Sequence, residues 1–161
     1  MSEHPPIPGV DLGEDEQIID HGTLLGYEWW LTTCREDDGT LRFIADILLP
    51  ARHPVARAYK AYDYQSSINR VLSIPYNDDI PHVANDIPGD DGVRVVMSSF
   101  HIRHTTCDRR TAVTSQMRSL ILGYHQANTP ENAEWCDQLE TALRERDAAE
   151  KRVNQLLGND Y

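Results

Sequence analysis

The turn Glu36-Asp37-Asp38-Gly39 constrains the fold more than any other feature of the sequence. An Asp-Gly pair supplies the positive φ angles that a tight turn requires, and a strand-like run flanks it on each side. Residues 27–35 are rich in aromatic and β-branched side chains. Residues 41–49 place Leu41, Phe43, Ala45 and Ile47 on one face, and Pro50 ends the run. The pattern therefore predicts an antiparallel hairpin.

The remaining periodicities extend this hairpin into an α+β fold. Residues 17–25 read as a strand that precedes it, and residues 93–104 read as a fourth strand with a near-continuous apolar start. Apolar residues at helical spacing predict helices over 53–72, 108–125 and 129–158. We expect a mostly antiparallel sheet of about four strands in the order β-β-β-α-β-α-α, ending in a long C-terminal amphipathic helix.

Composition and pattern divide the chain into three parts, of which the last is the C-terminal helix over residues 129–158. Residues 1–16 contain three prolines, two glycines and five acids, which is typical of a mobile arm. Residues 17–128 form the α+β domain, and residues 73–92 within it form a long irregular loop with three prolines.

Trp29 and Trp30 must point to opposite faces of their strand, so one joins the core while the other is covered by a helix or makes an exposed contact.

The last helix has the clearest signature in the chain. Thr129 suits the N-cap and Pro130 the first helical position. Its stripe follows alternating spacings of four and three, interrupted only by Arg146: Trp135, Leu139, Ala142, Arg146, Ala149, Val153 and Leu156. Four heptads are enough to favour a coiled coil, so residues 129–158 either pack back on the domain or join copies of the chain. We expect a homo-oligomer.

Charge restricts the partners. The chain has 26 acidic and 15 basic residues, a net charge of −11. General binding to DNA, RNA or an anionic membrane needs a basic face, so we expect this chain to bind none of the three. The leading hypothesis is a small acidic, non-enzymatic binding or inhibitor-type protein that engages a basic protein surface. Such a surface belongs, for example, to a nucleic-acid-binding host factor, and small acidic inhibitors from phages and mobile elements are similar in kind.

The cellular location follows from what the sequence lacks. It has no run of about 18 apolar residues, so no membrane span is expected. The N-terminus has neither a basic start nor an apolar core, so it is not expected to be a signal peptide. Three widely spaced cysteines, Cys34, Cys107 and Cys136, favour free thiols in a cytoplasmic protein over a disulfide scaffold.

An alternative hypothesis comes from one basic island. Residues 98–126 contain four arginines and one acid, a charge of +3, whereas the remainder of the chain carries −14. If Thr106 or Asp108 caps the helix that follows, its free N–H groups point toward the same place as the arginines. The loop 101–110 is therefore a candidate phosphoanion or nucleotide site, with these ligand-binding residues: His101, Arg103, Arg109 and Arg110.

Two short motifs extend this alternative to catalysis. His21-Gly22-Thr23 and His104-Thr105-Thr106 are both H-x-T, and the pair resembles two-histidine phosphoesterases. The resemblance implies that His21 and His104 act as acid and base, that Thr23 and Thr106 hold the phosphate, and that Arg103 or Arg109 stabilises charge. Gly22 departs from the family, which has an apolar residue there, and the duplicated two-lobe pattern of that family is not visible.

We expect no cofactor, with two metals as alternatives. His101-x-x-His104-x-x-Cys107 has zinc-ligand spacing, and a fourth ligand would come from one of four residues: Cys34, Cys136, His53 or His82. Calcium suits the carboxylates of loop 73–92, although their spacing is not that of an EF-hand. These carboxylates are Asp78, Asp79, Asp86, Asp90 and Asp91.

Overall fold

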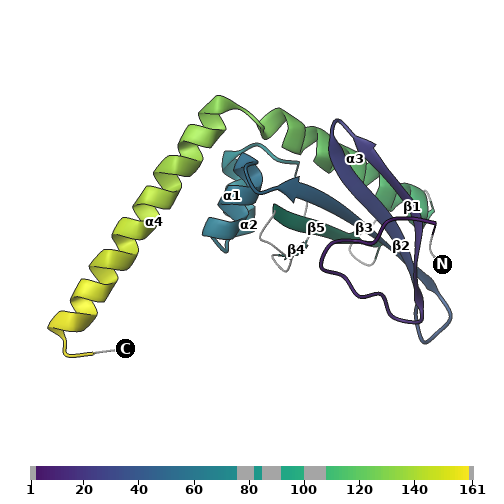
Figure 1. The fold of residues 1–161 in the computed structure, drawn as a ribbon, viewed down its shortest axis with the longest axis horizontal. Coiled ribbons are helices and arrows are strands. Elements are labelled where there is room, and N and C mark those ends of the chain that lie inside the picture. The colour runs from purple at the N-terminus through teal and green to yellow at the C-terminus, as the bar shows by residue number, and fades with distance from the viewer. Residues whose placement is uncertain (1–2, 76–81, 85–91, 100–107, 160–161) are drawn as a thin grey trace.

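A computed structural model describes residues 3–75, 82–84, 92–99 and 108–159 (Figure 1). It is an α+β fold whose antiparallel sheet has the order β1-β2-β3-β5-β4. The strands are β1 (Glu16–Leu24), β2 (Tyr27–Arg35), β3 (Leu41–Pro50), β4 (His82–Ala84) and β5 (Gly92–Ser98). The helices are α1 (Pro54–Ala61), α2 (Gln65–Val71), α3 (Arg109–Ala127) and α4 (Pro130–Leu156).

The predicted three-strand meander is confirmed. A tight turn with positive φ at Leu25 and Gly26 joins β1 to β2, and Leu24 pairs with Tyr27 across it. Gly39, with φ of 85°, closes the β2–β3 turn at the predicted place. Positive φ at both central positions of the β1–β2 turn, Leu25 and Gly26, matches the twist of a hairpin, whereas in the predicted β2–β3 turn glycine alone supplies it.

The second half of the sheet differs from the prediction in two ways. The fourth strand, expected over 93–104, is described only to Ser98, where it pairs with Ile44. At the next residue, the hydroxyl oxygen of Ser99 accepts the backbone N–H of Phe43 at 3.1 Å, in place of a backbone hydrogen bond between the two strands. The short strand β4 adds a fifth strand, which the sequence did not predict.

The single helix predicted over 53–72 is wrong, because two helices cover that range. Tyr62 has extended backbone and ends α1, and α2 begins at Gln65. The break reorients the chain so that Ile68 and Asn69 of α2 are buried, as Ala58 of α1 already is. The predicted helices over 108–125 and 129–158 are confirmed as α3 and α4, and their N-caps are Asp108 and Thr129.

The main core lies between one face of the sheet and the helices. Alternate residues of β2, β3 and β5 meet the buried stripe of α3. That stripe contains the apolar residues whose helical spacing predicts the helix over 108–125: Val113, Met117, Leu120, Ile121 and Tyr124. In Figure 1, α3 lies behind the sheet and the N-terminal arm lies in front of it.

His53 ties the helices to the core. Its Nδ1 accepts the backbone N–H of Val55 at 3.1 Å and so caps α1. The ring proton is therefore on Nε2, which donates to the carbonyl oxygen of Tyr124 at 3.1 Å and lies 2.9 Å from the hydroxyl of Tyr27. Burial lowers the pKa of His53 from 6.5 to about 4, so the ring is neutral at physiological pH.

Candidate functional site

The second half of helix α4 extends away from the domain (Figure 1). Its first half rests mainly on α1. There the buried Cys136 donates its thiol hydrogen to the carbonyl oxygen of Pro54, at 3.1 Å. On the same side, the guanidinium of Arg57 bonds to Asp137 and Glu140. These contacts fix where α4 starts, whereas the second half extends away from the sheet.

An apolar groove of about 430 Å³ runs between α4 and α2. Residues of the predicted heptad stripe line its α4 side: Trp135, Leu139, Ala142 and Arg146, with Leu143 beside them. Tyr62, Ile68 and Val71 line the opposite side. Val71 is 57% exposed, so the groove is open to solvent and its apolar walls are only partly covered.

The continuation of the same stripe has nothing to pack against among the described residues. Val153 and Leu156 of the stripe are 53% and 68% exposed, and Leu157, the residue that follows the helix, is 69% exposed. Large apolar side chains exposed side by side along a helix mark an interaction surface. The sequence therefore identified the stripe correctly, and the structure divides it into a half that lines a groove and a half that is free.

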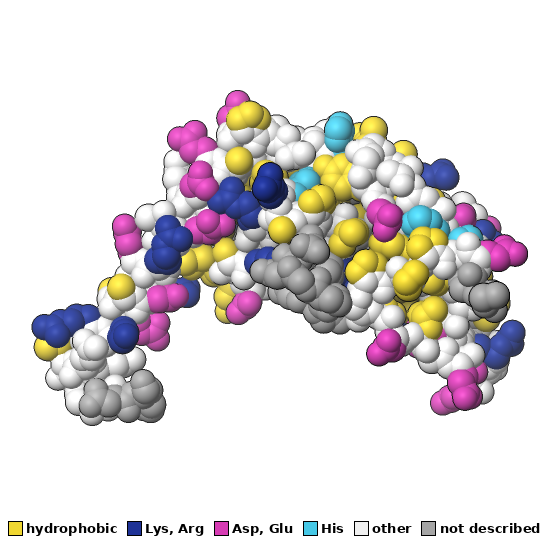
Figure 2. Space-filling model, viewed as in Figure 1, with side chains coloured by type: hydrophobic (Ala, Val, Ile, Leu, Met, Phe, Trp, Pro, Cys, Tyr) yellow, Lys and Arg dark blue, Asp and Glu magenta, His cyan; other side chains and the backbone are white. Residues whose placement is uncertain are grey.

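The charge of the chain is concentrated in its first fifty residues. They contain eleven carboxylates against two arginines, a net charge of −9, out of −11 for the chain. These residues form the N-terminal arm and the strands β1 to β3. Figure 2 shows acidic side chains around the lower right of the molecule, at the end of the sheet that lies far from α4.

The N-terminal arm, residues 3–15, lies on the sheet face opposite α3. Trp30 faces this side, while Trp29 faces the main core, so the predicted division of the two tryptophans is correct. The cover over Trp30 is the arm rather than a helix. Ile7 is 4% exposed and packs with Ile18 and Trp30, and the indole N–H of Trp30 donates to the carbonyl oxygen of Pro5 at 3.1 Å. The sequence predicts a mobile arm and gives no sign of this contact.

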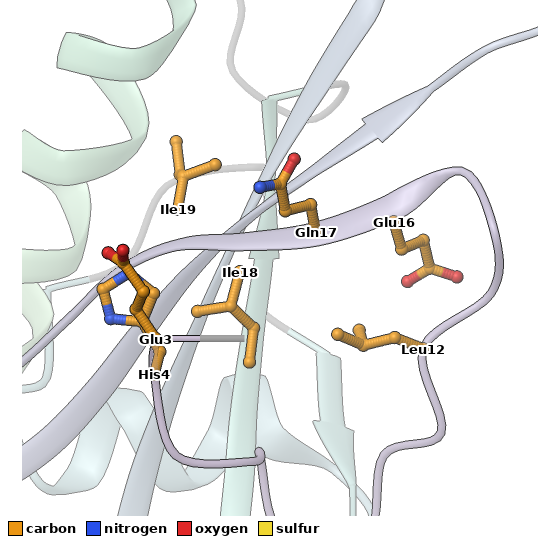
Figure 3. Close-up of a pocket in the computed structure, with 7 residues that line it drawn as sticks. All are labelled: Glu3, His4, Leu12, Glu16, Gln17, Ile18 and Ile19. Carbon is orange, nitrogen blue, oxygen red and sulfur yellow. The ribbon is translucent and has the colours of Figure 1, made fainter. Parts of the chain in front are cut away.

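Two hollows flank the arm where it lies on the sheet. The larger, of about 560 Å³, lies between the arm and β1, and Figure 3 shows Ile18 directed into it between His4 and Leu12. The smaller, of about 150 Å³, lies under Ile7 and Val10. Its floor contains a buried ion pair between Asp46 and Arg94, with a nitrogen–oxygen distance of 2.7 Å.

Only one of the two H-x-T motifs lies within the described residues. His21 is half-buried on β1. Its ring contacts that of Trp30 at a tilt of 34°, with 5.2 Å between centroids, and its Nε2 lies 3.7 Å from a carboxylate oxygen of Glu28. Thr23 is exposed on the same strand. His104 and Thr106 lie outside the described residues, so the meeting of the two motifs stays a prediction.

The basic island is described only from Asp108 onward. Arg109 and Arg110 are exposed on the first turn of α3. The Asp108 carboxylate caps that turn, accepting the N–H of Thr111 at 2.9 Å and its hydroxyl hydrogen at 2.8 Å. These bonds hold the pKa of Asp108 below its ordinary value, so an anion at this helix end would meet a carboxylate already there. His101 and Arg103 lie outside the described residues.

The candidate metal ligands are also divided. His101, His104 and Cys107 lie outside the described residues, as do the aspartates of loop 73–92 and the side chain of His82. Of the possible fourth zinc ligands, His53 and Cys136 are engaged in the buried hydrogen bonds given above. Across the described part of the chain, no group of three or more ligand-type side chains is placed to hold a metal ion.

Comparisons with known proteins give no relative. No family model, no curated protein and no solved structure matches this chain. None of the helices in the described residues is long and apolar enough to cross a membrane.

Proposed function

We propose that this chain is a dimeric, non-enzymatic binding protein. Helix α4 joins two copies, and each copy presents its acidic first fifty residues to a basic protein surface. The observation that carries the proposal is the division of the α4 stripe, in which one half lines an open groove and the other half is free. The free half of the stripe in one copy fills the groove of the other copy. A two-fold axis repeats this contact, so both grooves and both free halves are covered.

The charges of α4 favour an antiparallel arrangement. With the two helices centred between Arg146 and Ala149, Arg146 of one copy lies opposite Ala149 of the other. Leu139 and Ala142 then lie opposite Leu156 and Val153 of the second copy. Beside this seam, the Glu145 of each copy meets the Arg152 of the other, and symmetry makes this favourable pair twice.

A parallel arrangement of the same helices is disfavoured. Arg146 would face Arg146 of the second copy in the same layer of the seam, which places two like charges together. Glu145 would also lie beside Glu150 of the second copy, which adds a repulsion on each side. The antiparallel register removes both conflicts, and it brings the apolar end of one α4 to the groove of the other copy.

The acidic surface supplies the specificity of the proposed binding protein. A net charge of −9 on the arm and the first three strands attracts a basic partner at long range and speeds its association. Exposed Asp37 and Asp38 lie at the tip of the β2–β3 hairpin, where they are free of the dimer helix. Binding of this kind weakens as salt screens the charges.

The experiment measures binding of poly-L-lysine, used as a basic probe, at about 50 mM and about 300 mM salt. Changing Asp37→Lys and Asp38→Lys should weaken binding about ten-fold at the lower salt, since two of the acidic groups that attract the probe become basic. The control changes Asp63→Lys and Glu134→Lys, which alter net charge equally at exposed sites outside the first fifty residues. Equal loss in both variants, or affinity unchanged by salt, would contradict the proposal.

The phosphoanion or nucleotide site at 101–110 stays a prediction. Its described residues, Arg109 and Arg110, are exposed beside a helix end that Asp108 already caps. No contact among the described residues favours it over the binding protein, so the dimeric binding protein is our conclusion.

A further inference from the structure

The arm contacts the sheet through a proline-rich segment, Pro5-Pro6-Ile7-Pro8. Each proline fixes its own φ and biases the preceding residue toward extended backbone, so the segment favours a polyproline II conformation before it docks. A polyproline II strand has no internal hydrogen bonds, and its carbonyl oxygens are free to accept. The Pro5 carbonyl uses this freedom to accept the indole N–H of Trp30.

This contact has the chemistry by which proteins bind proline-rich peptides in trans. In those complexes an extended, preorganised ligand lies on an aromatic surface, and side-chain donors reach its carbonyl groups. Here the aromatic surface is Trp30, which is 1% exposed under the arm, with the tilted ring of His21 beside it. Ile7 supplies the apolar anchor against Ile18.

The arm fills this surface incompletely. After Pro8 the chain turns, with Gly9 at φ of 77° and the N–H of Val10 bonded to the carbonyl oxygen of Ile7 at 3.2 Å. The cavity of about 150 Å³ remains below the turn. Thr32, on the floor of this cavity, is 2% exposed, and its hydroxyl has no hydrogen-bond partner among the residues that the structure describes. A buried hydroxyl without a partner costs free energy, so the site contains one donor that the arm does not use.

Trp30 and Thr32 are two residues apart on β2 and share a face, so their backbones are about 6.6 Å apart along the strand. A polyproline II helix has three residues per turn, so its successive carbonyl groups point in three directions about the axis. A ligand that continued straight past the position of Pro8 would extend over the cavity instead of turning away from it, and a carbonyl group directed at the sheet would accept the hydroxyl hydrogen of Thr32.

We propose that the sheet face around Trp30 and Thr32 is a binding site for a proline-rich peptide of another protein. The chain's own Pro5–Pro8 segment occupies the site as a tethered competitor. A second copy of the arm is a poorer ligand, because it contains the same turn at Gly9 and leaves Thr32 unsatisfied. Glu16 lines both hollows and favours an arginine beside the prolines of the ligand. The proposal does not depend on α4.

The test uses the full-length chain and a fluorescein-labelled synthetic peptide, Arg-Pro-Pro-Ile-Pro-Pro-Ile-Pro, with fluorescence anisotropy as the readout. Ile7→Asp should release the arm, since docking would bury a carboxylate. The peptide should bind this variant at least about ten-fold more tightly than the wild-type chain, because the tethered competitor is gone. Ile7→Ala is a milder release and should give a smaller gain.

Two further variants, each combined with Ile7→Asp, test the donors. Thr32→Val keeps the side-chain shape and should weaken the peptide about five-fold, the loss of one hydrogen bond. Trp30→Phe keeps an aromatic ring without the N–H and should weaken it similarly, and Thr33→Val on the other sheet face serves as the control.

Three results would overturn the proposal. The first is no binding by the folded Ile7→Asp chain, and the second is equal affinity of this variant and the wild type. The third is an oligomer that Ile7→Asp dissolves but Leu156→Asp does not, which would make the arm of a second copy the occupant.

Discussion

The guanidinium of Arg57 on α1 holds the carboxylate of Glu140 on α4 through two bonds, Nε to Oε1 and Nη2 to Oε2, each of 3.1 Å. The same guanidinium bonds to Asp137, one turn earlier on α4. These hydrogen bonds raise the pKa of Arg57 further above its ordinary value. The two elements joined are 83 residues apart in sequence, and the bond sets the direction in which α4 leaves the domain.

Arg57→Gln should therefore destabilise the chain by about 1–2 kcal/mol, because a two-pronged, charge-assisted bond with a half-buried donor is lost. Chemical denaturation measures this change. Arg144→Gln is the control, since the bond of Arg144 to Thr141 is exposed and its loss should change stability by less than about 0.5 kcal/mol. Equal effects of the two substitutions would show that the Arg57 contact does not fix α4.

Gly123 of α3 is required by the close approach of Pro75 to the helix. A Cβ at this position would lie 2.3 Å from Cδ of Pro75, a distance that forces a shift. Alanine normally stabilises a helix by about 1 kcal/mol relative to glycine, so the expected sign is reversed here. Gly123→Ala should lower the free energy of unfolding by about 1–3 kcal/mol. Exposed Ser119→Ala, on the same helix, should leave it unchanged or slightly raised.

His53 should make stability depend on pH. Its pKa is about 4 in the folded chain and near 6.5 when unfolded, so below pH 6.5 the unfolded state binds the proton first. Stability is then full above pH 6.5 and falls as pH decreases toward 4. Protonation of this residue should lower the free energy of unfolding by about 2 kcal/mol between pH 7 and pH 5.

His53→Asn isolates this contribution, because asparagine also caps a helix but does not titrate. Over the same pH range, the free energy of unfolding measured by urea denaturation should fall by about 2 kcal/mol less in the variant than in the wild type. A wild type and variant with the same pH dependence would show that the ring is not held neutral by burial.

Charge reversal on α4 distinguishes the two orientations of the proposed dimer. In the antiparallel arrangement Glu145→Arg places arginine beside Arg152 and should raise the dissociation constant of the dimer about three-fold to ten-fold. Arg152→Glu should weaken it similarly, and the double variant should restore it. A parallel dimer would instead be strengthened by Glu145→Arg, because Glu150 would gain an opposite charge. Analytical ultracentrifugation of the four chains measures the difference.

The elements that sequence predicted well are those whose signals are local. The Gly39 turn, the Thr129 cap and the α3 stripe each depend on residues within a few positions of one another, and all three are confirmed. The break between α1 and α2 was missed because no glycine or proline marks it. Its cause is tertiary, since the break places Ile68 and Asn69 in the core.

The sites were harder to predict, because they depend on contacts between distant segments. Trp30 was known to face away from Trp29, but nothing local indicates that Pro5 would cover it. The run of prolines predicts a mobile arm, and the same residues are compatible with the extended segment that lies on Trp30. His21 was singled out by a three-residue motif, and in the fold its nearest neighbours are Trp30 and Glu28.

The central claim is that the free half of α4 joins two copies of the chain, and sedimentation equilibrium tests it most directly. The wild type should have twice the chain mass of 18.3 kDa. Leu156→Asp should sediment as the single chain, because it places a carboxylate in the shared seam while leaving the fold of each copy untouched. Leu122→Asp, at an exposed leucine of α3, should remain a dimer. A wild-type chain of 18.3 kDa, or a Leu156→Asp chain of twice that mass, would contradict the account.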